Sequence, residues 1–313
     1  MDRAVLIANP GASQFTGGLH RTALRTLSGH FEVESLWPRD EHDASALASA
    51  AAAGGSELVV AMGGDGIVHH VAQGLIGTDT VLGIVPVGTT NVVARLSGIP
   101  SRPGAALKLL TESFDVRRQP VLELELHRLD GTGERRSAVF AAGAGVDAEV
   151  VRQAESEPYR KYRFGGMHYA STALSTVWSD LRHRHASVTV AAGAHVADGI
   201  GFMAQFRDVY TYFGRTRLRL APGPPSPMHV LVPSEIRMRR APAILVGAVV
   251  RGDLDRVRGF RVWEGIERVS AVSDEPILAQ ADGELLGAVV RVEAVVRPAA
   301  LTVAVPQDSA SPR

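Results

Sequence analysis

The chain has 313 residues, 45% of them hydrophobic, with 33 basic and 33 acidic side chains and no cysteine. This length allows two domains, and the balanced charge argues against a nucleic-acid-binding protein, which needs a broad basic face. Without cysteine there are no disulfides, no thiolate metal sites and no cysteine nucleophile. No apolar run approaches the ~18 residues that span a bilayer. We therefore expect a cytoplasmic protein whose contact with membranes is peripheral.

The first part of the chain alternates strand and helix patterns in the βαβ manner. We expect strands at residues 5–8, 31–36, 58–62 and 81–85, and helices at residues 19–27, 43–53 and 68–75. Asp43 is a suitable N-cap for the second helix, and two glycines follow the end of that helix. The strand segments are continuous apolar runs, which is typical of parallel strands buried on both faces.

Two special loops follow successive strands of this part. Gly63-Gly64-Asp65-Gly66 comes after the strand at 58–62, and Pro86-Val87-Gly88-Thr89-Thr90-Asn91 comes after the strand at 81–85. Glycine lets backbone N–H groups approach a bulky anion, and a following helix directs its dipole to the same point. Either loop alone is explained by a tight turn. Two of them at carboxyl ends of neighbouring strands, where open α/β sheets bind ligands, predict a phosphate site.

From about Gln119 the hydrophobic pattern changes to a period of two, which indicates antiparallel strands with one wet face. The segments with this pattern are residues 121–126, 188–190, 215–220, 268–272 and 289–295. A helical pattern at residues 167–181 interrupts them. We place the domain boundary near residues 117–120, with domains at 1–118 and 119–298.

Four further segments admit two interpretations. Asp282-Gly283 is a common type I′ hairpin signal, yet Asp282 and Glu284 could also supply carboxylates for phosphoryl transfer together with Asp65. The basic runs at residues 182–185 and 237–240 favour either helix-end dipole interactions or contact with anionic lipid, and we prefer the former. Gly143-Ala144-Gly145 is a weak G-x-G pattern that we expect to be a bulge or turn.

In this order the motifs resemble the diacylglycerol kinase catalytic-domain family, which includes bacterial lipid kinases and sphingosine kinases. The segments that match are Asn9-Pro10, residues 63–66, residues 86–95, residues 142–149, residues 210–214 and residues 280–284. The resemblance implies an N-terminal three-layer α/β nucleotide-binding domain and a C-terminal antiparallel β-sandwich, with the active site in the cleft between them. It also implies that a final strand near residues 299–306 returns to the first domain.

The resemblance further implies which residues act. ATP would be bound by Asn9, Gly63, Gly64, Asp65, Gly66, Ile67, Gly88, Thr89 and Asn91. Asp282 and Glu284 would activate the hydroxyl of a lipid, and Asp65 would hold Mg²⁺ on the ATP phosphates. The partners expected are a lipid substrate and a transient membrane surface, with no nucleic acid; the oligomeric state is left open.

Several positions depart from the family pattern, three of them in or just after the two glycine loops. Ile67 stands where the family usually has Thr, His70 where it has Glu, and Val92 where an Asp is common. The main hypothesis is an ATP-dependent kinase that converts a lipid alcohol, preferably diacylglycerol, to its phosphate. The departures motivate a second hypothesis, a nucleotide- or lipid-binding protein with weak or no turnover. A third is an NAD-kinase-like enzyme with a soluble substrate.

Overall fold

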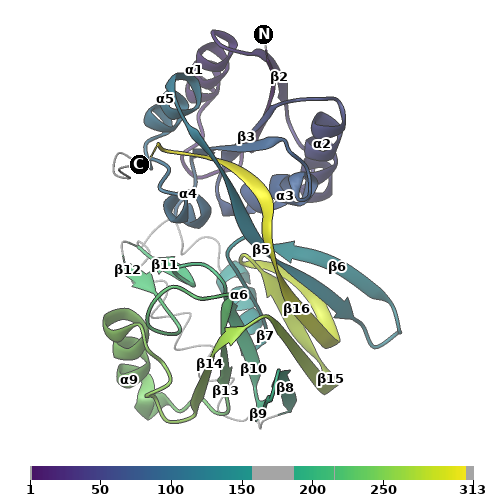
Figure 1. Ribbon diagram of the computed structural model, residues 1–313, viewed down its shortest axis with the longest axis vertical. Helices are drawn as coiled ribbons and strands as arrows, with labels where there is room; N and C mark the ends of the chain where they lie inside the picture. The colour runs from purple at the N-terminus through teal and green to yellow at the C-terminus, as the bar shows by residue number, and fades with distance from the viewer. Residues whose placement is uncertain (1, 157–186, 215, 308–313) are drawn as a thin grey trace. The chain divides into compact units, whose positions relative to one another are not determined.

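A computed structural model describes residues 2–156, 187–214 and 216–307 of the chain (Figure 1). It divides into two compact units, unit 1 with residues 1–121 and 298–313, and unit 2 with residues 122–297. The helix expected at residues 167–181 and the basic run at 182–185 lie outside the described residues. Among the helices that are described, none is long and apolar enough to cross a membrane.

Unit 1 is a parallel sheet between two layers of helices. Its strands are β1 (Arg3–Ala8), β2 (Glu32–Leu36), β3 (Leu58–Gly63), β4 (Val81–Pro86) and the end of β16 (Glu284–Val305), in the order β2-β1-β3-β4-β16. Its helices are α1 (Gly17–Ser28), α2 (Glu41–Ala53), α3 (Asp65–Leu75), α4 (Val92–Leu96) and α5 (Pro103–Glu112). Helices α1 and α5 pack together on one face of the sheet, and α2 and α3 on the other (Figure 1).

Helix α2 begins earlier than its pattern predicts. Its N-cap is Asp40, whose extended backbone lets the carboxylate accept the N–H of Asp43 at 2.8 Å. Asp43 lies in the first turn instead, where it accepts the backbone N–H of Arg39 at 2.8 Å. The prediction of Asp43 as the cap is therefore wrong, because the side chain of Asp40 already accepts the free N–H at the start of the helix.

Unit 2 is built on antiparallel strands. Its main run of paired strands is β14-β13-β10-β7-β15-β16, with β8 and β9 attached to β15 and with β5 and β6 attached to β16. The bounds are β5 Asp115–His127, β6 Gly133–Ala138, β7 Ala141–Gly145, β8 Val188–Ala192, β9 His195–Gly199, β10 Gly201–Gln205, β13 Met228–Pro233, β14 Phe260–Ile266 and β15 Arg268–Ala281. A separate pair consists of β11 (Thr211–Phe213) and β12 (Thr216–Leu218).

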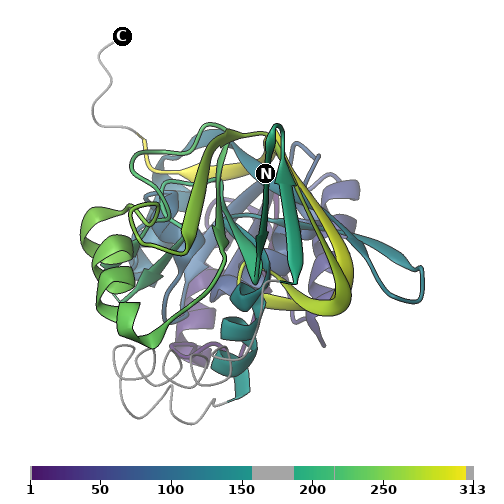
Figure 2. The same cartoon turned by 90° about the horizontal axis from the view of Figure 1, so that it is seen from below.

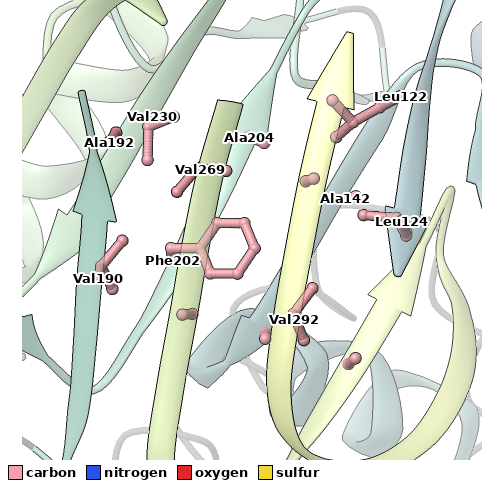
Figure 3. Close-up of a cluster of buried hydrophobic side chains, with 14 of the residues drawn as sticks. Leu122, Leu124, Ala142, Val190, Ala192, Phe202, Ala204, Val230, Val269 and Val292 are labelled. Carbon is pink, nitrogen blue, oxygen red and sulfur yellow. The ribbon is translucent and has the colours of Figure 1, made fainter. Parts of the chain in front are cut away.

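The core of unit 2 is formed by small and branched side chains around Phe202, which has no exposed surface. Figure 3 shows Phe202 surrounded by residues of several strands, among them Val190, Val269 and Val292. The helical elements among the described residues of the unit are α6 (Val146–Ser156), the 3₁₀ turn η1 (Met238–Arg240), α9 (Ala241–Leu245) and its π-helical continuation η2 (Val246–Arg251). Together the α/β unit and the antiparallel unit confirm the predicted fold class.

The glycine pattern at residues 143–145 is part of a strand, not a bulge or turn. These residues belong to β7, which pairs with both β10 and β15. A Cβ at Gly143 would lie 2.6 Å from the carbonyl oxygen of Phe202, so the close approach of β10 requires glycine there. The prediction failed because glycine in a strand interior can signal either a bulge or such an approach.

Candidate functional site

Three loops meet at the carboxyl end of the sheet in unit 1. They follow β1, β3 and β4, and backbone hydrogen bonds join them. The N–H of Asn9 donates to the carbonyl of Met62 at 3.0 Å, and the N–H of Val87 donates to the carbonyl of Gly63 at 2.9 Å. The N–H of Gln14 donates to the carbonyl of Val87, also at 2.9 Å. The motifs that the sequence places after three separate strands therefore form one surface.

The two glycine loops touch each other through their backbones. A Cβ at Gly88 would lie 2.4 Å from the Cα atom of Gly64 and 2.8 Å from Oδ1 of Asn91. Both distances are too short for a real side chain, so Gly88 is required by the packing of loop on loop. The result is a site lined by bare backbone, which is what close approach to a phosphate group needs.

Helix α3 begins directly at this surface. Its N-cap is Gly64, which has no side chain to cap the helix, and the first N–H that bonds back to the turn belongs to Val68, at 3.3 Å from the Gly64 carbonyl. The N–H groups of the first helical turn cannot find partners inside the helix. Together with the helix dipole, they favour an anion at this position.

Asp65 and Ile67 lie in the first turn of α3, where their side chains have different environments. The Oδ1 atom of Asp65 accepts the N–H of Val93 at 3.3 Å, which ties the first turn of α3 to that of α4. The side chain of Ile67 is buried, with 6% of its surface exposed, and it lies over Gly63. Ile67 can therefore contribute only its backbone N–H to a ligand.

The second loop is shaped by Asn91. This residue has φ of 51° and bonds Gly88 twice, accepting its N–H at 3.1 Å and donating to its carbonyl at 2.9 Å. Its amide thus supports the loop, and its direct contact with phosphate stays a prediction. The hydroxyl of Thr89 is exposed and lies 3.1 Å from that of Ser13.

Ser13 and Gln14 belong to the same surface, although no motif indicates them. The side-chain Nε2 of Gln14 donates to the carbonyl of Gly88 at 2.8 Å. The only signal for these two residues is their position just after Asn9-Pro10-Gly11, at the carboxyl end of β1.

In unit 2, Asp282 and Gly283 form the turn between β15 and β16. Both have positive φ, 55° and 86°, and the flanking residues Ala281 and Glu284 pair with each other. This is the two-residue geometry of a type I′ hairpin. The hairpin interpretation is therefore correct, and it does not exclude a chemical role for the carboxylates.

The carboxylate of Asp282 is buried and accepts three backbone N–H groups. Its Oδ2 accepts from Val139 at 2.7 Å, and its Oδ1 accepts from Phe140 at 2.8 Å and Ala141 at 3.1 Å. Only 4% of the residue is exposed, whereas Glu284 is half-buried. Both oxygens of Asp282 are thus engaged in holding the start of β7. Glu284 has the exposure that a proton acceptor needs.

A buried polar network lies behind this turn. Tyr210 donates its hydroxyl to Oδ2 of Asp147 at 2.5 Å, and Nε2 of Gln280 donates to the same oxygen at 2.5 Å. Oε1 of Gln280 in turn accepts the N–H of Gly283 at 2.9 Å. Burial raises the pKa of Asp147 to about 6, although the bonds from Tyr210 and Gln280 oppose that rise. The network therefore joins a titratable group to the acidic turn.

The described residues contain no group of three histidine or acidic side chains that could hold a metal ion by themselves. Mg²⁺ usually takes one or two carboxylates and completes its ligands with phosphates and water. Asp65 beside the glycine loops fits that requirement. The predicted carboxylates are divided between the units, with Asp65 in unit 1 and Asp282 and Glu284 in unit 2, and the predicted site between the domains stays a prediction.

Comparison with known proteins finds lipid kinases among the proteins that are similar to this chain. Residues 3–118 match the diacylglycerol kinase catalytic domain. The chain is 45% identical to a diacylglycerol kinase of Mycobacterium tuberculosis over 123 residues, which is 37% of this chain and 40% of the relative. It is 33% identical to a probable YegS-like lipid kinase of Xanthomonas oryzae over 158 residues, which is 49% of this chain and 48% of the relative. These matches span less than half of each relative, and they confirm the predicted family resemblance.

Matches over nearly the whole chain are more distant. A probable YegS-like lipid kinase of Pseudomonas fluorescens is 29% identical over 296 residues, or 92% of this chain and 89% of the relative. A putative diacylglycerol kinase of Bacillus anthracis has a similar fold, with a TM-score of 0.74 at 20% identity over 99% and 97% of the two chains. Yeast NADH kinase shares the fold more loosely, with a TM-score of 0.56 at 10% identity over 98% and 84% of the chains.

Proposed function

We propose that the chain is a lipid kinase that transfers the γ-phosphoryl group of ATP to the hydroxyl of a lipid alcohol, with diacylglycerol as substrate and phosphatidic acid as product. One observation supports this most strongly. The two glycine loops, in a segment that matches the diacylglycerol kinase catalytic domain, pack so closely that Gly88 has no room for a Cβ. Since the diacylglycerol substrate resides in a bilayer, the proposed enzyme is cytoplasmic and works at the membrane surface.

The nucleotide would bind through the loops of unit 1. The N–H groups at the start of α3 and the backbone around Gly88 would receive the phosphate oxygens. The hydroxyls of Ser13 and Thr89, 3.1 Å apart, stand at the same surface as further donors. Mg²⁺, which neutralises phosphate charge when it is bound, would be held by Asp65 and the phosphates.

The acceptor hydroxyl would lose its proton to Glu284. In the proposed step the substrate oxygen forms a bond to the γ-phosphorus, the bond from that phosphorus to the leaving oxygen of ADP breaks, and the hydroxyl proton passes to the carboxylate. Glu284 is preferred over Asp282 because the two oxygens of Asp282 already accept three backbone N–H groups. Asp282 would then position the turn.

The network behind the turn would fix the position of Glu284. Gln280 bonds Gly283 on one side and Asp147 on the other, so the backbone of the turn is connected to α6. A base must lie within hydrogen-bond reach of the proton it takes, which makes this orientation part of the mechanism. Gln280 and Asp147 would be positioning residues.

The test is transfer of labelled γ-phosphate from ATP to diacylglycerol in mixed micelles. Glu284→Gln should lower transfer by about 10²- to 10⁴-fold, the usual contribution of a general base, while leaving ATP binding unchanged. Full activity in this variant would exclude the assignment of the base, and failure of the unmodified chain to phosphorylate any lipid alcohol would exclude the function.

A second candidate is a protein of this family that binds nucleotide with weak turnover. The buried side chain of Ile67 favours it, because a hydroxyl at this position is absent from the phosphate surface. A lost hydrogen bond to a charged group costs ~1.5–3 kcal/mol, or roughly ten- to a hundredfold in rate. Ile67→Thr combined with His70→Glu should then raise transfer, whereas unchanged transfer would show that these departures are not what limits it.

The fold shared with yeast NADH kinase keeps a soluble acceptor as a third candidate. An assay with NAD in place of diacylglycerol distinguishes the third candidate from the first. Phosphorylation of NAD without phosphorylation of lipid would select the third candidate and reject the first.

A further inference from the structure

The helical segment at residues 241–251 is apolar on both of its faces. On the inner face, Ala241 and Ile244 of α9 pack with the small cluster around Val146 and Ile200. Gly247 of η2 is buried against Leu254 and Val257. Packing within the unit therefore accounts for the apolar residues of the inner face. It does not account for those of the outer face.

The outer face exposes large aliphatic side chains to solvent. Leu245 is 58% exposed, Val246 40% and Val250 75%. These are three of the eight exposed large hydrophobic side chains in the described part of the protein, and they lie within six residues of one another. Pro242 and Ala243 are exposed beside them. Such a concentration of apolar surface is typical of a docking site.

Arginines flank these side chains in the sequence. Residues 235–258 contain six arginines and three acidic residues. Arg237 and Arg240 share Glu235, and Arg256 pairs with Asp253. The remaining three, Arg239, Arg251 and Arg258, are exposed, and within the described ranges none of them has a carboxylate partner. The segment that contains the exposed aliphatic residues therefore carries exposed positive charge that carboxylates do not neutralise.

We propose that this outer face, named here the α9 face, docks on an anionic lipid bilayer. The α9 face consists of Leu245, Val246 and Val250 with Arg239, Arg251 and Arg258. Figures 1 and 2 both show α9 and its continuation at an edge of their unit. Aliphatic side chains would enter the headgroup boundary while the arginines contact lipid phosphates, the arrangement of interfacial helices.

The charge argues for lipid and against a second copy of the chain. A symmetric dimer through this face would place the same patch on itself. Two sets of unpaired arginines would then face each other in a partly desolvated interface, where like charges repel strongly. An anionic bilayer offers the complementary charge, at about 1 kcal/mol for each arginine near the surface.

The contribution of the aliphatic side chains of the α9 face is tested by sedimentation with vesicles of phosphatidylglycerol and phosphatidylcholine in equal parts. The test variant combines Leu245→Gln, Val246→Thr and Val250→Thr. The matched control combines Leu129→Gln, Val196→Thr and Val272→Thr, which alters three equally exposed side chains elsewhere in unit 2. We expect the test variant to bind at least about tenfold more weakly, since a buried CH₂ group contributes about 0.8 kcal/mol, and the control to bind as the unmodified chain does.

The contribution of the arginines of the α9 face is tested with the same vesicles. Arg239→Gln, Arg251→Gln and Arg258→Gln together should weaken binding about a hundredfold and reduce its dependence on salt. Arg21→Gln, Arg25→Gln and Arg102→Gln, which change three exposed arginines of unit 1, serve as the control. Vesicles of phosphatidylcholine alone should bind the unmodified chain weakly.

Two results would overturn the proposal. One is vesicle binding by both α9-face variants that equals that of the unmodified chain. The other is a combination of three findings: the unmodified chain forms dimers, the aliphatic variant is monomeric, and that variant binds lipid as the unmodified chain does. Such a result would make the α9 face an interface between copies of the chain. Thermal unfolding of each variant shows whether it is folded. Because Glu284→Gln should bind vesicles normally, this test is independent of the proposed transfer reaction.

Discussion

Asp282 and Glu284 lie two residues apart but occupy different environments. The left-handed backbone of Asp282 and its three N–H donors make it part of the hairpin itself. Asn also adopts the left-handed conformation readily, so Asp282→Asn changes the acceptor capacity of the side chain without changing the turn. This permits a clean separation of structural and chemical roles.

Asp282→Asn should lower the free energy of unfolding by about 1–3 kcal/mol, because its amide NH₂ would face buried N–H groups that need acceptors. Urea unfolding measures the change. Glu284→Gln, at a half-buried position, should remain within about 0.5 kcal/mol of the unmodified chain. If Asp282→Asn is as stable as the parent and has lost transfer, Asp282 is the base and our assignment is reversed.

Asp147 should make stability depend on pH. Its pKa is near 6 in the fold, above the ordinary 3.8, so the folded state binds more protons than the unfolded state and the stability contributed by this group decreases as pH rises from about 4 to 6. The buried charge then costs roughly 3 kcal/mol above pH 6. Asp147→Asn removes that cost.

The experiment compares unfolding of Asp147→Asn and the unmodified chain at pH 4.5 and 7.5, which lie on either side of the folded-state pKa of about 6. The variant should gain stability relative to the parent as pH rises, while its transfer activity falls if Asp147 helps to orient the turn. A stability difference that is the same at both pH values would show that folding does not raise the pKa of Asp147.

Only some of these residues were predictable. Asp282 and Glu284 stand in a recognisable motif, and the hairpin follows from Asp-Gly alone. The three donors to Asp282 lie more than 140 residues away in sequence, and Gln280 and Asp147 are separated by 133. Local patterns contain no information about such contacts. The same reason explains why Ser13 and Gln14 were not expected beside Gly88.

At the scale of elements, periodicity was an adequate guide in unit 1. The strands expected at residues 58–62 and 81–85 are found at Leu58–Gly63 and Val81–Pro86. The helix expected from residue 68 begins at Asp65, because the glycine motif itself forms its first turn. Glycine lowers the helical signal, so the motif that makes the site also conceals the start of the helix.

The contact between the two glycine loops gives the sharpest test at this scale. Gly88→Ala should weaken ATP binding by about ten- to a hundredfold. The Cβ of the new alanine would displace Gly64, and with it the backbone N–H groups at the start of α3 that we expect to bind phosphate. Gly104→Ala is the control, because a Cβ there meets no atom within 4 Å and Gly104 lies in α5. Isothermal calorimetry measures both, and equal affinities would contradict a phosphate site at Gly88.

At the scale of the whole molecule, two long strands belong to both units. β5 leads out of unit 1 into unit 2, and β16 leads back, so that Val303 pairs with Leu82 in the parallel sheet. The hydrophobic periodicity predicts a strand at residues 289–295, but it does not show which sheet the strand joins. The return of the chain was implied only by the family resemblance, because which sheet a strand joins depends on contacts distant in sequence.

The returning strand should stabilise unit 1. Val303 is fully buried, so Val303→Ala should lower the free energy of unfolding by about 2 kcal/mol. Val116→Ala, at a residue 55% exposed on β5, should change it by less than about 0.5 kcal/mol. Urea unfolding compares the two variants, and equal effects would show that the return of β16 contributes little.

The central claim, that this chain transfers phosphate to a lipid alcohol, is tested most directly by incubating it with labelled ATP and diacylglycerol micelles and measuring labelled phosphatidic acid. We expect transfer by the unmodified chain, a loss of about 10²- to 10⁴-fold in Glu284→Gln with ATP binding preserved, and weakened ATP binding in Gly88→Ala. No labelled lipid from the unmodified chain, or transfer by Glu284→Gln equal to that of the parent, would contradict the account.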